Sequence, residues 1–243
     1  MAVARTYSVA LVGVEGYPVE IETDLANGLP ALLLVGLPDT ALREARDRIR
    51  AAVINSHEQW PQRRITVGLS PASLPKRGSG FDLGIAVSIM AAAGVVPLGA
   101  VEGVAFLGEL GLDGRLRPVR GVLPAVAAAA RAGFRRVAVA RSNADEAALV
   151  PDLTVISAPS LCGLLAWLRG EDAEPDEEVQ VLGARESTGP GTAARSWNGR
   201  SSDRDRVGAG AGGADCPSPG RRPDLSEVLG QPAARRAAEI SAA

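Results

Sequence analysis

The order of apolar and polar positions in the first forty residues is typical of β-strands. Residues 6–12 have the composition of a strand, residues 19–23 alternate strictly between polar and apolar side chains, and residues 31–37 form a continuous apolar run. Alternation indicates a strand with one buried face, and a continuous run indicates a strand that is buried on both faces. We therefore predict three strands at the start of a buried sheet.

Helical spacing begins directly after these strands. Pro38 and Asp39 are typical of a helix start, and the residues from there to Asn55 place their apolar side chains on one stripe. That stripe consists of Leu42, Ala45, Ile49, Ala52 and Val53. Charged residues occupy the other face, so we predict an amphipathic helix that ends at Asn55.

The most distinctive segment is the Pro- and Gly-rich loop SPASLPKRGSG at residues 70–80. A strand is predicted before it at 63–69, and residues 81–93 after it form a helix that is apolar nearly all round. A helix without a polar face belongs inside a core, so we expect this one at the centre of the domain. Gly94 is its expected carboxy-terminal cap, because glycine tolerates a left-handed backbone.

Short strands and helices follow from residue 104 onwards. Two strands at 104–110 and 116–119 flank the pair Asp113-Gly114, which predicts a tight hairpin. The later elements are expected at 123–132 (helix), 137–140 (strand), 144–149 (helix), 153–156 (strand) and 161–168 (helix). Ser160 is the expected amino-terminal cap of the last helix.

Composition divides the chain into three parts. Residues 1–171 hold most of the apolar side chains, and we predict one α/β (α+β) domain of mixed sheet with packed helices there. Residues 172–223 contain most of the acidic run EDAEPDEE and then a Gly/Ser/Arg-rich stretch without apolar periodicity, which indicates a disordered linker. Residues 224–243 favour a short helix that opens a second, truncated module.

Charge and cysteine content narrow the classes of function. Basic and acidic side chains are nearly equal in number within residues 1–171, so no domain-wide field attracts nucleic acid. Cys162 and Cys216 are too far apart for a Cys-x-x-Cys pair, which fits a reduced, cytoplasmic protein. The chain start lacks a signal-peptide pattern, and no apolar run reaches membrane-spanning length.

Motifs for nucleotide, metal and triad chemistry are missing from the sequence. A phosphate-binding loop requires Gly-x-x-x-x-Gly-Lys-[Ser/Thr], whereas the sole lysine, Lys76, is followed by Arg77. One histidine, His57, is too little for a metal site or a catalytic triad. Glycines of the predicted linker match Gly-x-Gly-x-x-Gly by composition alone, at Gly208, Gly210 and Gly213. We predict no catalytic, cofactor-binding or metal-ligating residue.

Basic residues near the Pro- and Gly-rich loop are the candidates for a contact with DNA or another partner. Lys76 and Arg77 precede the apolar helix, where glycines allow backbone amides to approach a phosphate. The simpler interpretation, that these glycines only allow the turn onto a buried helix, is the favoured one. Arg63 and Arg64 are further candidates, although arginines at such positions are more often solvated.

Six segments carry a resemblance to a known family. They are TYSVALVGVEG, LPALLLVGLPDTALREARDRIRAAV, RRITVGLSPASLPKRGSGFDLGIAV, FLGELGLDGRLRPVRGVLPAV, RAGFRRVAVARSNADEAALV and, at the end of the chain, DLSEVLGQPAARRAAEISAA. The first five resemble the amino-terminal domain of ComM/YifB-type, magnesium-chelatase-like AAA+ ATPases, and the sixth resembles the stretch that opens their AAA+ module. The resemblance implies a fold like that of the Lon proteolytic domain and of a ribosomal small-subunit protein domain.

Similarity to Lon also places two positions of a serine-lysine dyad on this chain. The lysine position corresponds to Leu123, and the serine position corresponds to Asp82 or, with the loop aligned instead of the helix, to Gly80. None of the three supplies a hydroxyl nucleophile or an amine. Ser79 is adjacent but lacks a desolvated amine, because we expect Lys76 in the same exposed loop. We therefore predict no peptidase activity; a residual Lon-type hydrolase is the alternative.

The resemblance further implies what the longer family members do. They form ATP-driven homo-hexameric rings that use ATP and Mg and act on DNA, promoting branch migration in natural transformation and recombination. This chain stops before the Walker A motif, so we expect that it neither binds nor hydrolyses ATP by itself. Its expected partners are the AAA+ ring and DNA, and no membrane is expected. Nothing in the sequence supports magnesium insertion into a porphyrin.

Overall fold

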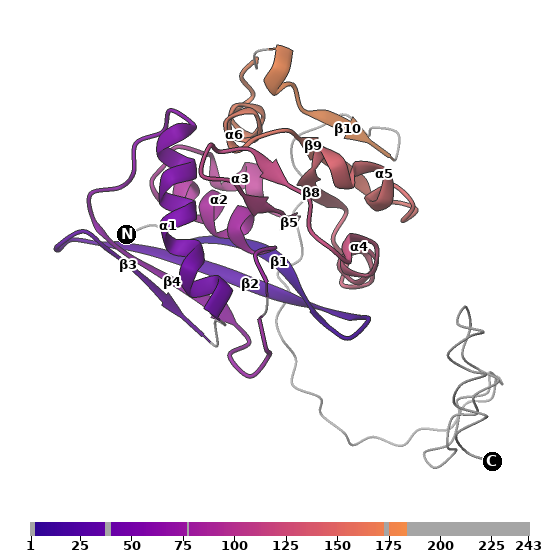
Figure 1. Cartoon of the computed structure of the whole chain (residues 1–243), viewed down its shortest axis with the longest axis horizontal. Coiled ribbons are helices and arrows are strands. Elements are labelled where there is room, and N and C mark those ends of the chain that lie inside the picture. Colours follow the sequence, from indigo (N-terminus) through magenta and orange to yellow (C-terminus); the bar gives the residue numbers. More distant parts are fainter. Residues whose placement is uncertain (1–2, 37–39, 77, 173–174, 184–243) are drawn as a thin grey trace. The chain divides into compact units, whose positions relative to one another are not determined.

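The centre of the fold is an eight-stranded mixed sheet (Figure 1). In the computed structural model, which describes residues 3–36, 40–76, 78–172 and 175–183, the strand order is β10-β9-β8-β5-β1-β2-β4-β3. The strands are β1 (Ala4–Val12), β2 (Glu15–Ala26), β3 (Ala31–Val35), β4 (Arg64–Ser70), β5 (Val104–Leu107), β8 (Arg136–Ala140), β9 (Thr154–Ala158) and β10 (Gln180–Leu182). The predicted class, α/β with a mixed sheet, is confirmed.

The sheet mixes antiparallel and parallel pairing, and each edge strand pairs in the opposite sense to the strands beside it: β3 is parallel to β4, and β10 is antiparallel to β9. β1, β2 and β4 pair antiparallel, whereas β1, β5, β8 and β9 pair in parallel. β1 turns into β2 at Gly13, whose φ of +64° suits a tight turn. Parallel neighbours cannot be joined by such a turn, so helical segments cross over the sheet between β5, β8 and β9.

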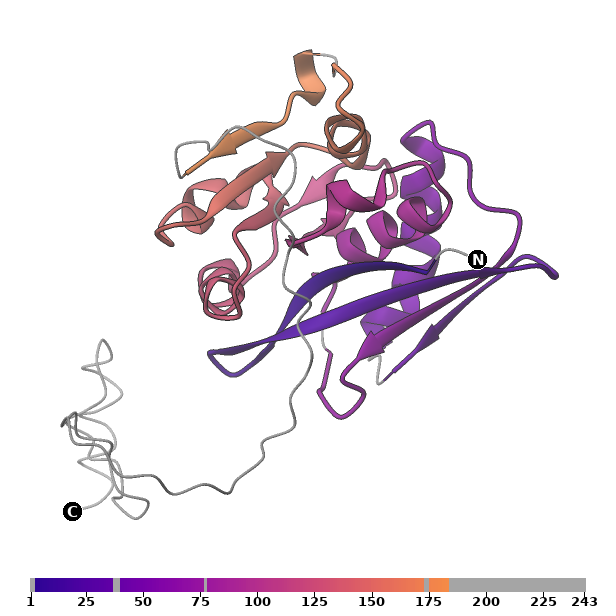
Figure 2. The same cartoon turned by 180° about the vertical axis from the view of Figure 1, so that it is seen from behind.

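Helices cover both faces of the sheet (Figures 1 and 2). They are α1 (Thr40–Asn55), α2 (Asp82–Ala92), α3 (Leu98–Val101), α4 (Val122–Arg131), α5 (Ala144–Ala147) and α6 (Leu161–Arg169), with 3₁₀ turns η1 (Arg141–Asn143) and η2 (Pro175–Glu177). Adjacent residues of one strand, such as Ala105 and Phe106, belong to different apolar clusters. The two clusters therefore lie on opposite faces, one against α1, α2 and α6 and the other against α4 and α5.

The central helix is α2, as its all-round apolar sequence predicts. Every residue from Asp82 to Ala91 is buried. A Cβ on Gly84 would come within 2.7 Å of Ile21 Cδ1, so the glycine lets the helix pack closely on β2. The hydroxyl of Thr6 donates to the Gly84 carbonyl oxygen at 2.9 Å, which ties β1 to the same turn of the helix.

Other predicted features are also present. The stripe of α1 is buried at Ala45, Ile49, Ala52 and Val53, whereas the side chain of Leu42 lies outside the described residues. The Asp113-Gly114 hairpin exists, although its strands β6 (Glu109–Leu110) and β7 (Leu116–Arg117) are shorter than predicted. The hydroxyl of Ser160 accepts the Gly163 amide at 3.1 Å, which confirms Ser160 as the cap of α6.

The prediction that the apolar run 31–37 is a buried strand is wrong. The strand in this run, β3, is an edge strand of the sheet, and Leu33 and Val35 are 40% and 54% exposed. β3 pairs only with β4, in parallel, and within the described residues no helix covers the face that Leu33 shares with Val35. A run of apolar residues cannot distinguish a central strand from an edge strand, because that depends on the order in which distant strands pair.

A second difference lies at the predicted boundary after residue 171. Residues 180–182 form β10, which pairs antiparallel with β9, although the composition indicates a linker from residue 172 onwards. Backbone pairing with β9, together with the packing of Leu182 against an apolar cluster, explains why this short segment forms a strand. The rest of the predicted linker from residue 184 and the helix at 224–243 lie outside the described residues.

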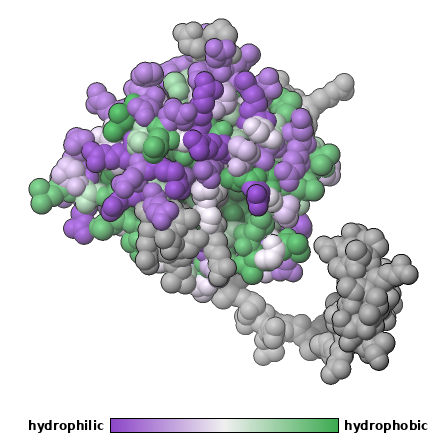
Figure 3. Space-filling view, viewed as in Figure 1, coloured by the Kyte–Doolittle hydropathy of each residue, from purple (hydrophilic) through white to green (hydrophobic). Residues whose placement is uncertain are grey.

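A further feature of the fold is the apolar character of its helices and of one face of its surface. None of the helices in the described ranges is long and apolar enough to cross a membrane. On the face drawn in Figure 3, hydrophilic residues interrupt the apolar ones.

Candidate functional site

An ion pair occupies the start of the central helix. The side chain of Asp82 is 0% exposed, and Arg48 reaches it from α1. Arg48 Nε donates to Oδ2 at 3.1 Å and Nη2 donates to Oδ1 at 3.3 Å, while the Leu110 amide lies 3.4 Å from Oδ2. The carboxylate therefore joins three elements, α1, α2 and β6.

Burial dominates the proton affinity of this carboxylate. Loss of water raises the pKa of Asp82 from 3.8 to about 6, even though the hydrogen bonds and charge of Arg48 act in the opposite direction. For Arg48, burial lowers the pKa, but the Asp82 carboxylate outweighs burial and the net direction is upward. The asymmetry arises because the Arg48 side chain keeps 24% of its surface in water and Asp82 keeps none.

Ser79, the hydroxyl nearest to the dyad position, is engaged by a carboxylate. Its Oγ donates to Glu109 Oε2, from strand β6. Glu109 also acts electrostatically on Asp82 and Arg48, so serine, two carboxylates and the guanidinium form one polar cluster. A serine nucleophile needs a base that can remove its proton at neutral pH, and among the described residues of this cluster there is no histidine or amine.

Lys76 differs most from its expected placement. The residue is 0% exposed, which corrects the expectation that it lies in an exposed loop. Its Nζ donates to the carbonyl oxygens of Pro71 at 2.5 Å and Leu74 at 3.0 Å, and burial lowers the pKa of the ammonium. The lysine closes its own loop from inside, because backbone carbonyl oxygens there need a donor when water is excluded. In this conformation Lys76 does not present a charge to DNA.

The amides at the start of α2 have acceptors within the protein. The Asp82 amide donates to the Ser79 carbonyl oxygen at 3.1 Å, and the Leu83 amide donates to the Gly108 carbonyl oxygen at 3.1 Å. Amides that already have partners do not form a phosphate cradle. The Asp82 and Leu83 amides are therefore not free to bind a phosphate.

The two remaining dyad positions take no part in the hydrogen bonds of the Asp82–Arg48 pair. Leu123 lies in the first turn of α4 with its side chain 38% exposed, and its amide donates to Glu146 Oε1 at 3.0 Å. Gly80 accepts the Gly108 amide at 3.1 Å and would have room for a Cβ, with Val119 Cγ1 at 3.8 Å. No hydrogen bond between described residues joins Leu123 to Asp82 or Gly80.

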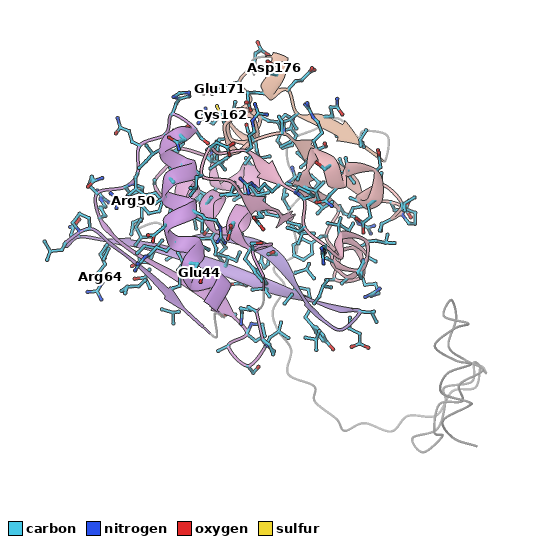
Figure 4. The ribbon with its side chains drawn as sticks, in the orientation of Figure 1. Glu44, Arg50, Arg64, Cys162, Glu171 and Asp176 are labelled. Atoms are coloured by element: carbon cyan, nitrogen blue, oxygen red, sulfur yellow. The ribbon has the colours of Figure 1, made fainter. Side chains whose placement is uncertain are left out.

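The arginine candidates lie at the start of strand β4. Arg63 and Arg64 are exposed where β4 begins, and Figure 4 shows Arg64 at the margin of the sheet formed by β3 and β4. Arg77 lies outside the described residues. Within the described ranges no group of His, Cys, Asp or Glu could hold a metal ion.

Sequence reasoning did not single out Arg48 or Glu109. A usable signal exists for Arg48, which stands three residues after Ala45 and four before Ala52 and thus borders the buried stripe of α1. Nothing in the local sequence marks Glu109, because its partners Ser79 and Arg48 are distant in the chain.

The fold and the site together define a mixed α/β domain whose central helix begins at a buried ion pair instead of an exposed nucleophile. The family described as subunit ChlI of Mg-chelatase matches residues 21–143, about half of the chain. The chain belongs to this family, and its similarity to ComM and YifB proteins corresponds to their amino-terminal domain.

Three relatives illustrate this relationship. An uncharacterized protein of Mycobacterium tuberculosis is 43% identical over 243 residues, which is 100% of this chain and 42% of that protein. Competence protein ComM of Haemophilus influenzae is 42% identical over 175 residues, 72% of this chain and 34% of ComM. The protein YifB of Salmonella typhimurium is 35% identical over 243 residues, 100% of this chain and 41% of YifB. The chain thus spans about two fifths of the length of these relatives or less.

A weaker similarity extends to a protease. Lon protease 2 of Thermus thermophilus is 28% identical over 138 residues, which is 54% of this chain and 17% of that protein.

Proposed function

We propose that this chain is a non-catalytic amino-terminal accessory domain of a ComM/YifB-type AAA+ ATPase. The observation that carries the proposal is the burial and pairing of Asp82, one of the two residues, with Gly80, that the Lon resemblance places at the nucleophile position. It is fully buried and paired with Arg48, so this position serves packing between helices.

The other groups near this position support the same proposal. Ser79 donates its proton to Glu109, and the amine of Lys76 is hydrogen-bonded to Pro71 and Leu74. A serine-lysine mechanism requires the amine to accept the serine proton, and an ammonium that already donates to two carbonyl oxygens is poorly placed to do so. Leu123 at the lysine position has no titratable group.

ATP, Mg and the homo-hexameric ring belong, in this proposal, to the longer protein. The accessory domain docks on the AAA+ ring and assists its assembly or its engagement of DNA, including branch migration in recombination. Arg63 and Arg64 remain the exposed basic candidates for a DNA or partner contact. Lys76 and Arg77 stay untested candidates: Lys76 is buried in this structure, and Arg77 lies outside the described residues.

Incubation of the purified chain with unfolded casein tests the loss of peptidase function. We expect no cleavage by the wild type, and Ser79→Ala serves as the matched control for a nucleophile in this loop. Cleavage that disappears in Ser79→Ala would establish the rival function, a residual Lon-type hydrolase. Cleavage that persists in Ser79→Ala would point to another nucleophile and also contradict the accessory role.

Two binding experiments test the remaining parts of the proposal. Calorimetric titration of the chain with MgATP should give no heat of binding. In the full-length protein, the double variant Arg63→Ala/Arg64→Ala should bind DNA more weakly and with a smaller salt dependence. The control is the double variant Arg46→Ala/Arg50→Ala, which removes the same number of positive charges from exposed positions of α1. Equal effects of both pairs would remove Arg63 and Arg64 from the contact.

A further inference from the structure

Residues 175–183 cross the end of the domain as a strap, and they are the last described residues before position 184. The strap begins with η2 beside α6 and continues as β10, which places Val181 opposite Ile156 of β9 at the sheet edge. Figure 4 shows Asp176 of the strap close to Cys162 and Glu171 at the same end of the molecule.

Polar and backbone contacts hold the strap, with little apolar burial. None of the side chains at 176–183 is buried, and Val181 is 48% exposed, whereas Val155 and Ile156 of β9 are 0% exposed. Arg141 Nη2 donates to the Glu178 carbonyl oxygen at 2.6 Å, and the Ser160 hydroxyl donates to the Glu177 carboxylate. These two bonds involve charged groups and contribute about 1.5 to 3 kcal/mol each, whereas each backbone bond to β9 contributes about 0.5 to 1.5 kcal/mol, because water replaces the lost partners on release.

Two glycines allow the strap to approach the domain closely. A Cβ on Gly163, in the first turn of α6, would collide with the Glu177 carbonyl oxygen. A Cβ on Gly183, at the other end of the strap, would collide with the Leu153 carbonyl oxygen, and Gly183 has a φ of +98°. Backbone therefore lies on backbone at both ends, and a side chain at either position removes the contact.

We propose that the strap is a releasable latch: residues 175–183 detach from α6 and β9 together while the rest of the domain stays folded. Release leaves both apolar clusters intact, since only half-buried Val179 and Leu182 pack against them from the strap. The released residues lengthen the connection to residues 184–243 by up to about 30 Å. This inference does not depend on the proposed function.

Cys162 of α6 is a reporter for the release. It is half-buried; burial, followed by the charges of Glu177 and Glu58, raises the pKa of its thiol. Release of the strap uncovers the thiol and removes the Glu177 charge, so more thiolate is present and it reacts faster. In the full chain with Cys216→Ser, Cys162 is the sole thiol.

The experiment measures the reaction of this thiol with an aromatic disulfide reagent in the Cys216→Ser chain. We expect Cys162 to be labelled faster than the protein unfolds globally. In Gly163→Ala the labelling rate should increase by a further factor of about ten or more. The melting temperature of this variant should stay equal or rise, because alanine favours helix over glycine. Hydrogen exchange should show lost amide protection in β10 and retained protection in β8. Gly183→Ala should give the same result from the other end.

Gly99→Ala is the matched control, because it adds a methyl group to open space in the short helix α3. It should leave the labelling rate unchanged. The latch is refuted if Cys162 reacts only at the rate of global unfolding, or if Gly163→Ala and Gly99→Ala label equally. A fall in melting temperature of Gly163→Ala, with protection of β8 and β10 lost together, would also refute it, because the strap would then be an integral part of the core.

Discussion

The buried carboxylate of Asp82 makes the stability of this domain depend on pH in an unusual direction. Burial raises the pKa of Asp82 from 3.8 to about 6 in the folded state, despite the pairing with Arg48. The folded protein then holds the proton more tightly than the unfolded chain does. The contribution of Asp82 to stability is therefore greatest below pH 4 or so, falls as the pH rises to about 6, and is constant above that value.

The two pKa values of Asp82 determine the size of this effect. Their difference changes the free energy of unfolding by up to about 3 kcal/mol, since each pH unit between them corresponds to about 1.4 kcal/mol. Urea unfolding of the wild type and of Asp82→Asn, measured from acidic to neutral pH, isolates it. The substitution retains the side-chain shape but removes both the titration and the charge that pairs with Arg48, so the change of the difference with pH, and not its absolute size, reports the titration of Asp82.

We expect the wild type to lose stability relative to Asp82→Asn as the pH rises through this window. Asp145→Asn, an exposed carboxylate in α5, is the control and should give a difference that hardly changes with pH. A flat difference for Asp82→Asn would refute the reasoning. A wild type that gains stability relative to Asp82→Asn on the alkaline side would show that Arg48 lowers the pKa more than burial raises it.

Three further substitutions test the packing of the site. Arg48→Ala leaves the Asp82 carboxylate buried without its cation, so chemical denaturation at neutral pH should show a free energy of unfolding lower by about 3 to 5 kcal/mol. This loss should be smaller near pH 5, where the carboxyl is protonated, and an equal loss at both pH values would contradict the reasoning. Lys76→Met retains the aliphatic stem but leaves two loop carbonyl oxygens without their charged donor, so urea unfolding should show a free energy of unfolding lower by about 1.5 to 3 kcal/mol. A variant as stable as the wild type would mean that the Lys76 ammonium is in water and not bound to these oxygens. Gly84→Ala forces a methyl group against Ile21 and should lower the free energy of unfolding by about 1 to 3 kcal/mol in the same assay. An unchanged free energy of unfolding would mean that the Ile21 side chain moves away without cost.

The relatives of this chain are longer than the chain itself. The chain covers 42% of its M. tuberculosis relative and 34% of H. influenzae ComM.

Much of the architecture follows from local patterns in the sequence. The all-round apolar run predicted α2 as the central helix because a helix with no polar side must be surrounded by protein. The stripe of α1, the Asp113-Gly114 hairpin and the Ser160 cap were predicted for the same kind of reason: each depends on residues within a few positions of one another. The family resemblance likewise rests on several sequence segments and their succession along the chain, which can be recognised without a structure.

Tertiary structure alone decided which charged residues pair and which strand lies at the edge of the sheet. The partners in the pairs Arg48 with Asp82 and Ser79 with Glu109 are thirty or more residues apart, and only the packing of α1, α2 and β6 brings them together. Lys76 is buried because its loop folds over it, and β3 is exposed because no further strand pairs with it among the described residues. Periodicity reports which face of an element is apolar, but burial of a polar group depends on whether distant elements supply its partners, and that information is absent from any local stretch of sequence.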